Sequence, residues 1–217
     1  MPSYYPVFLD LKGRKCVIIG GGQVAERKVP PLLECDAKVA FVSPQITPSI
    51  QRWVDEGKVS WERRDYAEGD LKGAFLAIAA TDEPQINRAI AREAAEKNIL
   101  LNVVDVTPLC TFIAPATVKR GDVVVAISTG GASPALARKL RETLENSDLL
   151  DYADLAEILS RARREVKERK IQVHPDRWQE YINGELMAMV KEGREQEALD
   201  YLLKGLSKNS LQKEARE

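Results

Sequence analysis

The chain has 217 residues, of which 44% are hydrophobic and 30% charged, and its formal net charge is −1. This length leaves room for one full-sized domain and a smaller companion, and the charge balance gives no general attraction to nucleic acid or to membranes. No apolar run approaches the roughly 20 residues that span a bilayer, and the N-terminus lacks the pattern of a signal peptide. We therefore expect a cytoplasmic protein that binds neither nucleic acid nor membranes.

The cysteines Cys16, Cys35 and Cys110 are scattered along the chain and form no Cys-x-x-Cys pair. Disulfide frameworks and zinc sites use paired or closely spaced cysteines. We predict that these residues are buried free thiols without a metal or redox role.

Strand-like apolar runs alternate with helical patterns over about the first 105 residues. The expected strands cover residues 15–19, 39–42, 59–63, 75–80 and 99–104, and the expected helices cover 24–34, 46–56 and 84–97. Continuous apolar runs suit parallel strands that are buried on both faces, so this order predicts a Rossmann-type doubly wound parallel sheet. Because Pro30 and Pro31 fall inside the first helix, we expect that helix to be short or bent.

The second half of the chain has a different pattern. Residues 112–128 predict a hairpin with a turn at Gly121-Asp122, and a helix over 134–145 follows, with leucines at 136, 140 and 144 on one side. From residue 151 on, apolar residues mark helices around 155–166, 178–190 and 199–206, and residues 208–217 are polar enough to fray. We predict a Rossmann domain over 1–113, a central hairpin and helix segment over 114–148 and an all-helical C-terminal domain over 149–217.

The first strand runs into a glycine turn with the spacing Gly20-x-Gly22-x-x-Ala25. In dinucleotide-binding proteins, glycines at this spacing tighten the turn and let the backbone approach a pyrophosphate, while a small third residue lets the helix pack on the strand. Gln23 and Val24 would then begin a helix whose first amides and positive dipole end face the phosphate. The strand before the loop and the helix after it favour nucleotide binding over a plain tight turn.

Other candidate residues lie at the ends of strands on the same predicted sheet edge, where open α/β sheets bind their ligands. The candidates are Ser43, Pro44, Gln45, Thr81, Asp82, Asn102, Val103 and Asp105. Structural roles fit some of them equally well: Asp82 as a helix cap, Asn102 as the residue that closes a strand end, and Asp105 as a turn or cap aspartate. The second strand ends without the acidic residue that often binds the adenine ribose, and no arginine marks a 2′-phosphate site, which favours NAD over NADP.

Four motifs in order resemble one family, the precorrin-2 dehydrogenases of sirohaem synthesis, including the N-terminal half of the fused sirohaem synthases. The motifs are residues 20–28, 80–82, 102–105 and 128–138. The resemblance implies an NAD-dependent oxidation of precorrin-2 to sirohydrochlorin, which takes a hydride and releases a proton. It also implies an NAD-binding domain, a central dimerisation segment that makes a homodimer, and a helical C-terminal domain.

The resemblance also assigns roles to residues. Asp105 would be the general base, because a carboxylate that loses hydration beside nicotinamide and an apolar macrocycle becomes a better proton acceptor. Precorrin-2 is an octacarboxylate, so its site needs cations and amide donors. The candidates for substrate binding are Thr129, Gly130, Gly131, Ser133, Arg120 and Arg138. Each arginine also fits an ordinary solvated charge.

Two further hypotheses stay open. Some relatives insert ferrous iron into sirohydrochlorin, but the single histidine, His174, fits a turn or a helix cap, and we predict no metal site from the ligand spacings. Asp105 could still hold iron transiently inside the macrocycle's site. An NAD-sensing regulatory module that signals through the helical tail is an alternative of another class. A short-chain dehydrogenase is disfavoured because the chain lacks Tyr-x-x-x-Lys.

Overall fold

The computed structural model describes residues 4–207, so the predicted frayed tail at 208–217 lies outside the described residues. The chain forms two compact units. The first extends to Ala114 and includes Gly130–Ala132, and the second holds Pro115–Thr129 and continues from Ser133. The hairpin and the C-terminal helices therefore belong to one unit, and the predicted boundary between 114–148 and 149–217 stays a prediction.

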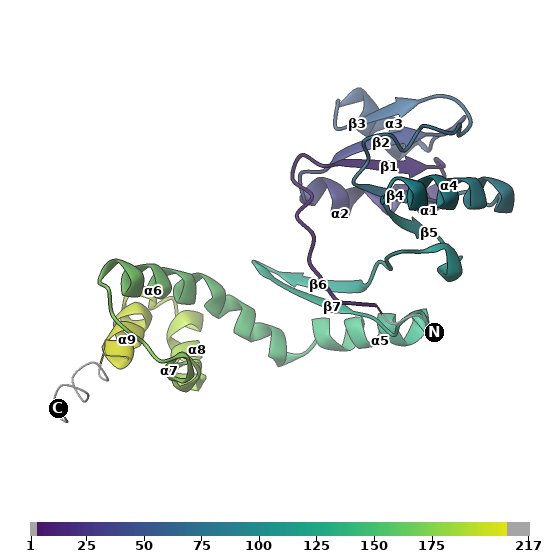
Figure 1. The fold of residues 1–217 in the computed structure, drawn as a ribbon. Coiled ribbons are helices and arrows are strands. Elements are labelled where there is room, and N and C mark those ends of the chain that lie inside the picture. The colour runs from purple at the N-terminus through teal and green to yellow at the C-terminus, as the bar shows by residue number, and fades with distance from the viewer. Residues whose placement is uncertain (1–3, 208–217) are drawn as a thin grey trace. The chain divides into compact units, whose positions relative to one another are not determined.

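The first unit is built on a five-stranded parallel sheet in the order β3-β2-β1-β4-β5 (Figure 1). The strands are β1 (Lys15–Ile19), β2 (Lys38–Val42), β3 (Val59–Glu62), β4 (Leu76–Ala79) and β5 (Leu100–Val103). The chain builds outward from β1 to β3 and then crosses to the other side of β1 for β4 and β5. This reversal confirms the predicted doubly wound sheet, and sheets of this kind bind ligands at the carboxyl ends of the strands where the order reverses, here β1 and β4.

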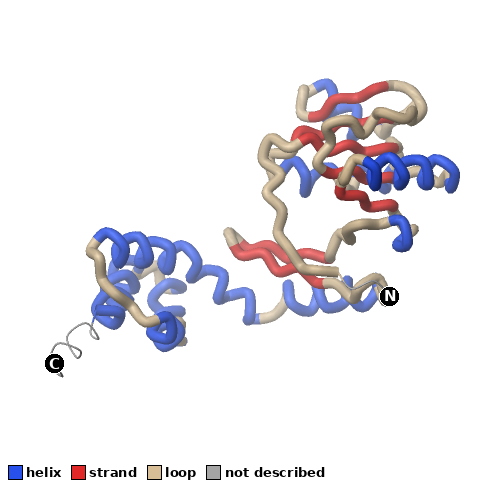
Figure 2. The backbone as a smooth tube through the Cα atoms, in the orientation of Figure 1, coloured by secondary structure: helices blue, strands red, loops and turns tan. Residues whose placement is uncertain are grey.

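Helices cover both faces of the sheet (Figure 2). They are α1 (Gln23–Glu26), α2 (Val29–Glu34), α3 (Pro48–Asp55), α4 (Pro84–Glu96) and the 3₁₀ turn η1 (Thr107–Leu109). The helix expected over 24–34 is broken in two, with Pro30 and Pro31 in the first turn of α2, where a missing N–H breaks no helical bond. Helix α3 starts two residues later than expected because the Thr47 hydroxyl caps it, accepting from the Ile50 amide at 3.3 Å.

The core of this unit lies on both sides of β1. Cys16 and Ile18 belong to one buried cluster, with residues of α2 and α3, while Val17 and Ile19 belong to another, with residues of α4. Because successive residues of a strand point to opposite faces, β1 is buried on both sides, as its apolar run predicts. The sheet edge at the end of β1 is thereby held between two packed helical layers.

The second unit begins with the hairpin of β6 (Ala116–Arg120) and β7 (Val123–Ile127), which turns at Gly121 with a φ of 57°. Helix α5 (Pro134–Glu145) packs on the hairpin. Four further helices and a 3₁₀ segment follow among the described residues: η2 (Asp148–Leu155), α6 (Ala156–Glu168), α7 (Pro175–Tyr181), α8 (Gly184–Lys191) and α9 (Glu195–Ser207). Their shared apolar core includes Leu155, Leu186 and Leu202.

The single helix predicted around 178–190 is wrong, because the chain forms two helices there. Asn183 caps α8 with its side-chain oxygen, which accepts from the amides of Glu185 and Leu186 at 3.1 Å each. An asparagine that competes for backbone bonds starts a new helix in place of continuing the old one. His174 caps α7, with Nδ1 accepting from the Asp176 amide at 3.4 Å, which confirms the cap role.

The cysteines are free but differ in burial. Cys16 is fully buried in β1, and burial raises its pKa to about 11. Cys110 is half-buried, whereas Cys35 is exposed, so the prediction that all of them are buried is wrong. Cys35 is the residue that follows α2, in the turn before β2. Within residues 4–207 we find no helix with the length and apolarity needed to cross a membrane.

Candidate functional site

Three consecutive glycines follow β1, and the space around them differs. A Cβ on Gly20, whose φ is 104°, would lie 2.3 Å from the Ala80 carbonyl oxygen, and one on Gly21 would lie 2.0 Å from that of Gln45. Gly20 and Gly21 thus let the loop pack against the chain segments after β4 and β2. Nothing lies within 4 Å of a Cβ on Gly22. The third glycine therefore leaves open space where a pyrophosphate can meet the backbone, which fits the predicted dinucleotide.

The helix after the loop is shorter than the sequence predicts. Helix α1 spans only Gln23–Glu26, and its N-cap residue, Gly22, provides no side-chain cap. A single turn adds few aligned peptide dipoles, so the predicted dipole contribution to phosphate binding is small here. What the loop offers a phosphate is mainly its backbone amides and its open space.

A cavity of about 480 Å³ opens beside the loop. Its walls come from the glycine loop, the segment after β4, helix α4 and the turn after β5. The lining residues are Gly22, Gln23, Val24, Ala80, Thr81, Asp82, Pro84, Asn87, Arg88, Val104, Asp105, Val106 and Leu109. The cavity therefore brings together six of the predicted site residues, namely Gly22, Gln23, Val24, Thr81, Asp82 and Asp105.

Asp105 lies in the turn after β5 with a φ of 61°, in the left-handed region that non-glycine residues rarely adopt. The turn is held by the Val106 amide, which donates to the Val103 carbonyl at 3.2 Å, and by the Cys110 thiol, which contacts the Val103 amide and carbonyl at 3.2 Å each. The side chain of Asp105 is exposed and caps no helix, since η1 has Val106 as its N-cap residue. Of the two structural alternatives for Asp105, the turn position is found and the helix cap is not, and the residue also lines the cavity.

Thr81 and Asp82 form the opposite rim of the cavity together with the first turns of α4. The Thr81 hydroxyl accepts from the Glu83 amide at 3.1 Å, and Glu83, not Asp82, is the N-cap residue of α4. Asn87 is only 4% exposed, and its Nδ2 donates to the Thr81 carbonyl at 3.0 Å. Asn87 Oδ1 is buried without a hydrogen-bond partner among the described residues. The segment that carries Thr81 is therefore hydrogen-bonded to the buried side of α4.

Comparison with known families agrees with this geometry. Residues 7–116 match a family described as putative NAD(P)-binding, over about half of the chain. The chain belongs to this family. Residues 120–147 match a second family, described as the central part of sirohaem biosynthesis proteins. The second match covers most of the hairpin, the second glycine loop and α5.

Curated relatives and solved structures point the same way. The siroheme synthase of Nitrosomonas europaea is 39% identical over 211 residues, covering 96% of this chain and 44% of the relative. That of Azotobacter vinelandii is 40% identical over 198 residues, covering 90% and 43%. The chain thus spans less than half the length of these relatives. The structure of SirC, a precorrin-2 dehydrogenase, matches with a TM-score of 0.74 at 27% identity and covers 93% of this chain and 100% of that one. The resemblance drawn from the sequence is confirmed.

Several predicted cofactor residues of this NAD(P)-binding family member lie outside the cavity. They are Gly20, Ser43, Pro44, Gln45, Asn102 and Val103. The Ser43 hydroxyl donates to the Gln45 carbonyl at 2.7 Å. Asn102 is buried, and its Nδ2 donates to the Phe112 carbonyl at 3.1 Å, so it closes the strand end. Their contact with a cofactor stays a prediction, while these bonds show what they do in the fold.

The second glycine loop uses its hydroxyl groups internally. The Thr129 hydroxyl accepts from the Ser133 amide at 3.0 Å, and the Ser133 hydroxyl caps α5 by accepting from the Leu136 amide at 3.2 Å. Gly130 and Gly131 both have positive φ, at 63° and 89°. The loop is thus a preformed turn, and its role in substrate binding stays a prediction.

The arginines predicted for substrate binding have carboxylate neighbours in the chain. Arg120 forms ion pairs with Asp151 at 2.9 Å and Asp154 at 2.6 Å, which tie the hairpin to η2. Arg138 pairs with Glu142, one turn along α5, at 2.8 Å, although its side chain is 76% exposed. A substrate carboxylate would have to compete with these pairs.

Sequence reasoning missed Asn87 and Arg88, because it stopped at the strand ends. Both lie one to two turns into α4, the helix that follows the Thr81-Asp82 motif. Residues at that distance along a helix can return to the same sheet edge. The position of Asn87 and Arg88 shortly after the Thr81-Asp82 motif, within the predicted helix, is the signal by which the sequence could identify them.

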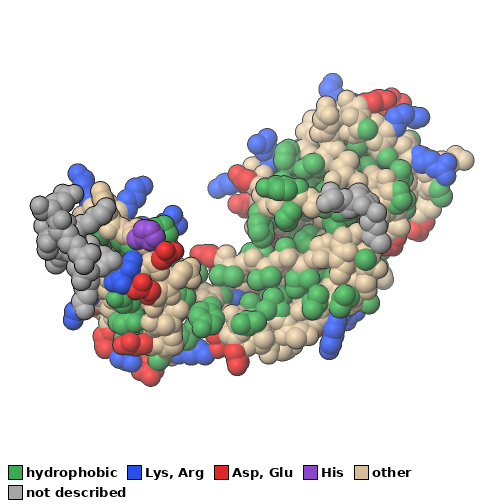
Figure 3. All heavy atoms as spheres, turned by 60° about the horizontal axis from the view of Figure 1, so that its bottom comes forward, with side chains coloured by type: hydrophobic (Ala, Val, Ile, Leu, Met, Phe, Trp, Pro, Cys, Tyr) green, Lys and Arg blue, Asp and Glu red, His purple; other side chains and the backbone are tan. Residues whose placement is uncertain are grey.

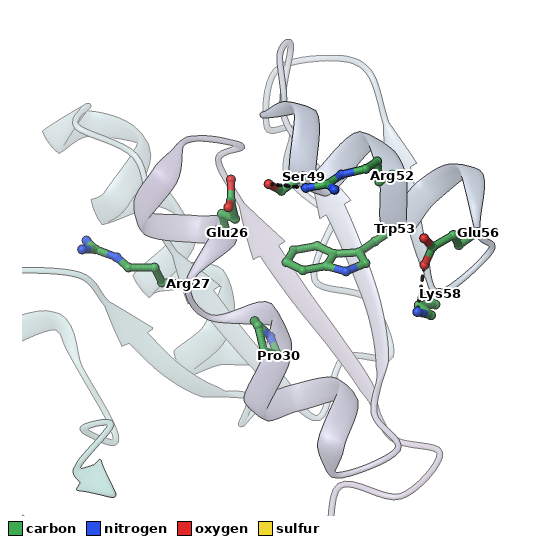
Figure 4. A pocket seen from close by; sticks show the side chains of 8 residues that line it. All are labelled: Glu26, Arg27, Pro30, Ser49, Arg52, Trp53, Glu56 and Lys58. Atoms are coloured by element: carbon green, nitrogen blue, oxygen red, sulfur yellow. Dashed lines mark hydrogen bonds and ion pairs between the residues drawn. The ribbon is translucent and has the colours of Figure 1, made fainter.

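A second hollow, of about 410 Å³, lies between α1, α2 and α3 (Figure 4). Trp53 projects into it, and two of its cations have partners among its lining residues: Lys58 pairs with Glu56 at 2.8 Å, and Arg52 donates to the Ser49 hydroxyl at 3.3 Å. None of the predicted site residues lines this hollow. Within residues 4–207, no group of three or more His, Cys, Asp or Glu side chains is arranged to hold a metal ion.

Proposed function

We propose that this chain is an NAD-dependent dehydrogenase that oxidises precorrin-2 to sirohydrochlorin in sirohaem synthesis. The observation that carries the proposal is that one cavity is lined both by Gly22, with its open space, and by Asp105. A dehydrogenase needs a hydride acceptor and a proton acceptor side by side. The family match, the siroheme synthase relatives and the SirC structure support this choice over other NAD-binding enzymes. The proposal includes the cytoplasmic location expected from the sequence.

The chain's own residues would supply binding and proton transfer. Gly22 lets the backbone approach the pyrophosphate, and Asn87 holds the Thr81 segment at the rim. NAD supplies the hydride acceptor when it is bound. Asp105 accepts the proton that leaves precorrin-2 with the hydride, so two hydrogens leave the substrate as H⁻ and H⁺. The left-handed turn places the backbone of Asp105 at the cavity.

The test is an anaerobic incubation of the protein with precorrin-2 and NAD. Appearance of the sirohydrochlorin spectrum together with stoichiometric NADH supports the dehydrogenase. A folded protein that binds NAD but changes neither spectrum would contradict it and favour the NAD-sensing module. Replacing NAD by NADP tests the preference for NAD, and adding ferrous iron tests whether the metal is inserted as well.

We also propose that two copies of the chain pair through the hairpin and α5. Leu136 and Leu140 lie on one side of α5 and are 50% and 46% exposed, whereas α5 packs on the hairpin through the buried Ala137. Val124 on β7 is exposed as well, and Figure 3 shows hydrophobic side chains gathered over the hairpin and α5. An apolar stripe of this kind favours a protein interface. Light scattering should show a dimer that Leu140→Glu converts to a monomer, and a monomeric wild type would contradict the proposal.

A further inference from the structure

We propose that Arg88 binds a carboxylate of the substrate at the cavity and thereby determines specificity for a polycarboxylate. The inference rests on the proposed function and deepens it. Among the described residues that line the cavity, Arg88 is the one cation, and the acids there are Asp82 and Asp105. The structure thus places a guanidinium at the same cavity as the proposed base.

The guanidinium of Arg88 is free because its own helix offers it no carboxylate. Arginines in or next to other helices pair with a glutamate three or four residues away: Arg138 with Glu142, Arg141 with Glu145, Arg169 with Glu165, Arg177 with Glu180 and Arg194 with Glu197. The corresponding neighbours of Arg88 are Pro84, Gln85, Ala91 and Arg92. No ion pair or hydrogen bond of the Arg88 side chain is found within residues 4–207. Its donors are therefore available to a bound molecule.

The charges around the cavity explain why a substrate anion needs this cation. Asp82 and Asp105 would repel any carboxylate that approaches the proposed base. A guanidinium offsets that repulsion and binds a carboxylate through two parallel N–H···O bonds. Arg120 and Arg138, the arginines expected from the sequence, already pair with carboxylates of the chain. Arg88 is the better candidate because its binding of a carboxylate breaks no existing pair.

The chain provides a matched control in Arg92, which is exposed one turn further along α4, likewise shows no ion pair within the described residues, and does not line the cavity. The experiment compares Arg88→Gln, Arg88→Lys and Arg92→Gln in the full chain. Glutamine and lysine are good helix formers and Arg88 is exposed, so all three variants should fold. The affinity for sirohydrochlorin is titrated by its absorbance without NAD, and the affinity for NAD is titrated separately.

We expect Arg88→Gln to weaken sirohydrochlorin binding, and to raise the KM for precorrin-2, by roughly tenfold, since a charge-assisted bond of this kind is worth about one decade of affinity. The kcat and the NAD affinity should stay near the wild-type values. Arg88→Lys should keep the charge but lose the paired bonds, and so give an intermediate effect. Arg92→Gln should behave like the wild type.

Other outcomes would overturn the assignment. A loss of NAD affinity with unchanged sirohydrochlorin binding would move Arg88 to the cofactor's phosphates, and equal effects of Arg88→Gln and Arg92→Gln would reduce its role to general charge. Wild-type protein that does not oxidise precorrin-2 contradicts the proposed function, whereas normal turnover with unchanged binding in Arg88→Gln contradicts this inference alone. The sirohydrochlorin titration measures the contribution of Arg88 to binding in either case, because it requires no turnover.

Discussion

Asn87 Nδ2 donates to the carbonyl oxygen of Thr81 at 3.0 Å, while the Oδ1 atom of the same amide is buried without a partner among the described residues. The bond joins the second turn of α4 to the segment that forms the rim of the cavity. A buried acceptor without a donor costs about 1–3 kcal/mol, so the favourable bond of this amide is offset in part by its unsatisfied oxygen. The rim of the proposed cofactor site therefore depends on a helix residue that the sequence motif does not include.

Asn87→Ala should loosen the Thr81 segment. We expect NAD affinity to fall by several-fold and the free energy of unfolding to change by no more than about 1 kcal/mol, because the variant removes both a good bond and an unsatisfied oxygen. Calorimetric titration with NAD and a thermal melt measure the two effects. Gln85→Ala, on the exposed side of the same helix, is the control and should change neither. Unchanged NAD binding in Asn87→Ala would show that the rim does not need this bond.

Gly22→Asp should separate binding from folding. The site has room for a side chain, but a carboxylate there would meet the pyrophosphate, so we expect a normal melt and a loss of NAD affinity of about 100-fold or more. Gly21→Ala should instead lower the melting temperature, since its Cβ would collide with the Gln45 carbonyl and destabilise the loop. NAD titrations and melts of both variants distinguish these effects. Normal NAD binding by Gly22→Asp would contradict the loop assignment.

Asp105→Asn should remove the proton acceptor and keep the turn, because asparagine tolerates the left-handed backbone. We expect kcat to fall by about 10²- to 10⁴-fold, with NAD affinity unchanged. Asp82→Asn, at the same cavity, is the matched control and should keep most of the turnover. Initial rates of sirohydrochlorin formation measure both. A larger loss in Asp82→Asn than in Asp105→Asn would exchange the roles of the two acids.

Glu93 should contribute to stability in a pH-dependent way. Burial disfavours its ionised form, but bonds from Lys97, Tyr66 and the Gly69 amide outweigh this and hold the pKa of Glu93 below its ordinary value. A lowered pKa in the folded state stabilises the protein above the unfolded-state value of about 4.3, and this contribution is lost as the pH falls through the folded-state pKa.

We therefore expect Glu93→Gln to lower the free energy of unfolding near neutral pH by about 1–3 kcal/mol and to make the acid part of the stability curve shallower. Urea unfolding at several pH values from neutral down to about 3 measures both effects. The exposed Glu96→Gln, on the same helix, is the control and should follow the wild type. A parallel shift of the whole curve, without a change in its acid part, would contradict the role of the Glu93 charge.

Local patterns were sufficient for most of the elements. The run at Lys15–Ile19 and the helix at Pro134–Glu145 begin and end where the sequence predicts, because apolar periodicity, a proline in the first turn and flanking turns act over a few residues. Apolar spacing alone predicts one helix where α7 and α8 form two, because it does not include the cap that Asn183 provides for α8. The leucine stripe of α5 was correctly placed on one side, but periodicity does not say what covers that side.

The order of strands and helices along the chain, the position of the glycine loop and the predicted ligand-binding edge of the sheet follow from local sequence, because each depends on residues close together in the chain. Which glycine stays open depends on tertiary contacts, since the neighbour of Gly20 is Ala80 and that of Gly21 is Gln45, and both lie far away in the sequence. The tertiary structure likewise decided which arginines are already paired, because Arg120 meets Asp151 across 31 residues. Contacts between segments that are remote in the sequence determine where open space and unpaired charges lie. They bring Gly22, Asp105 and Arg88 to one cavity.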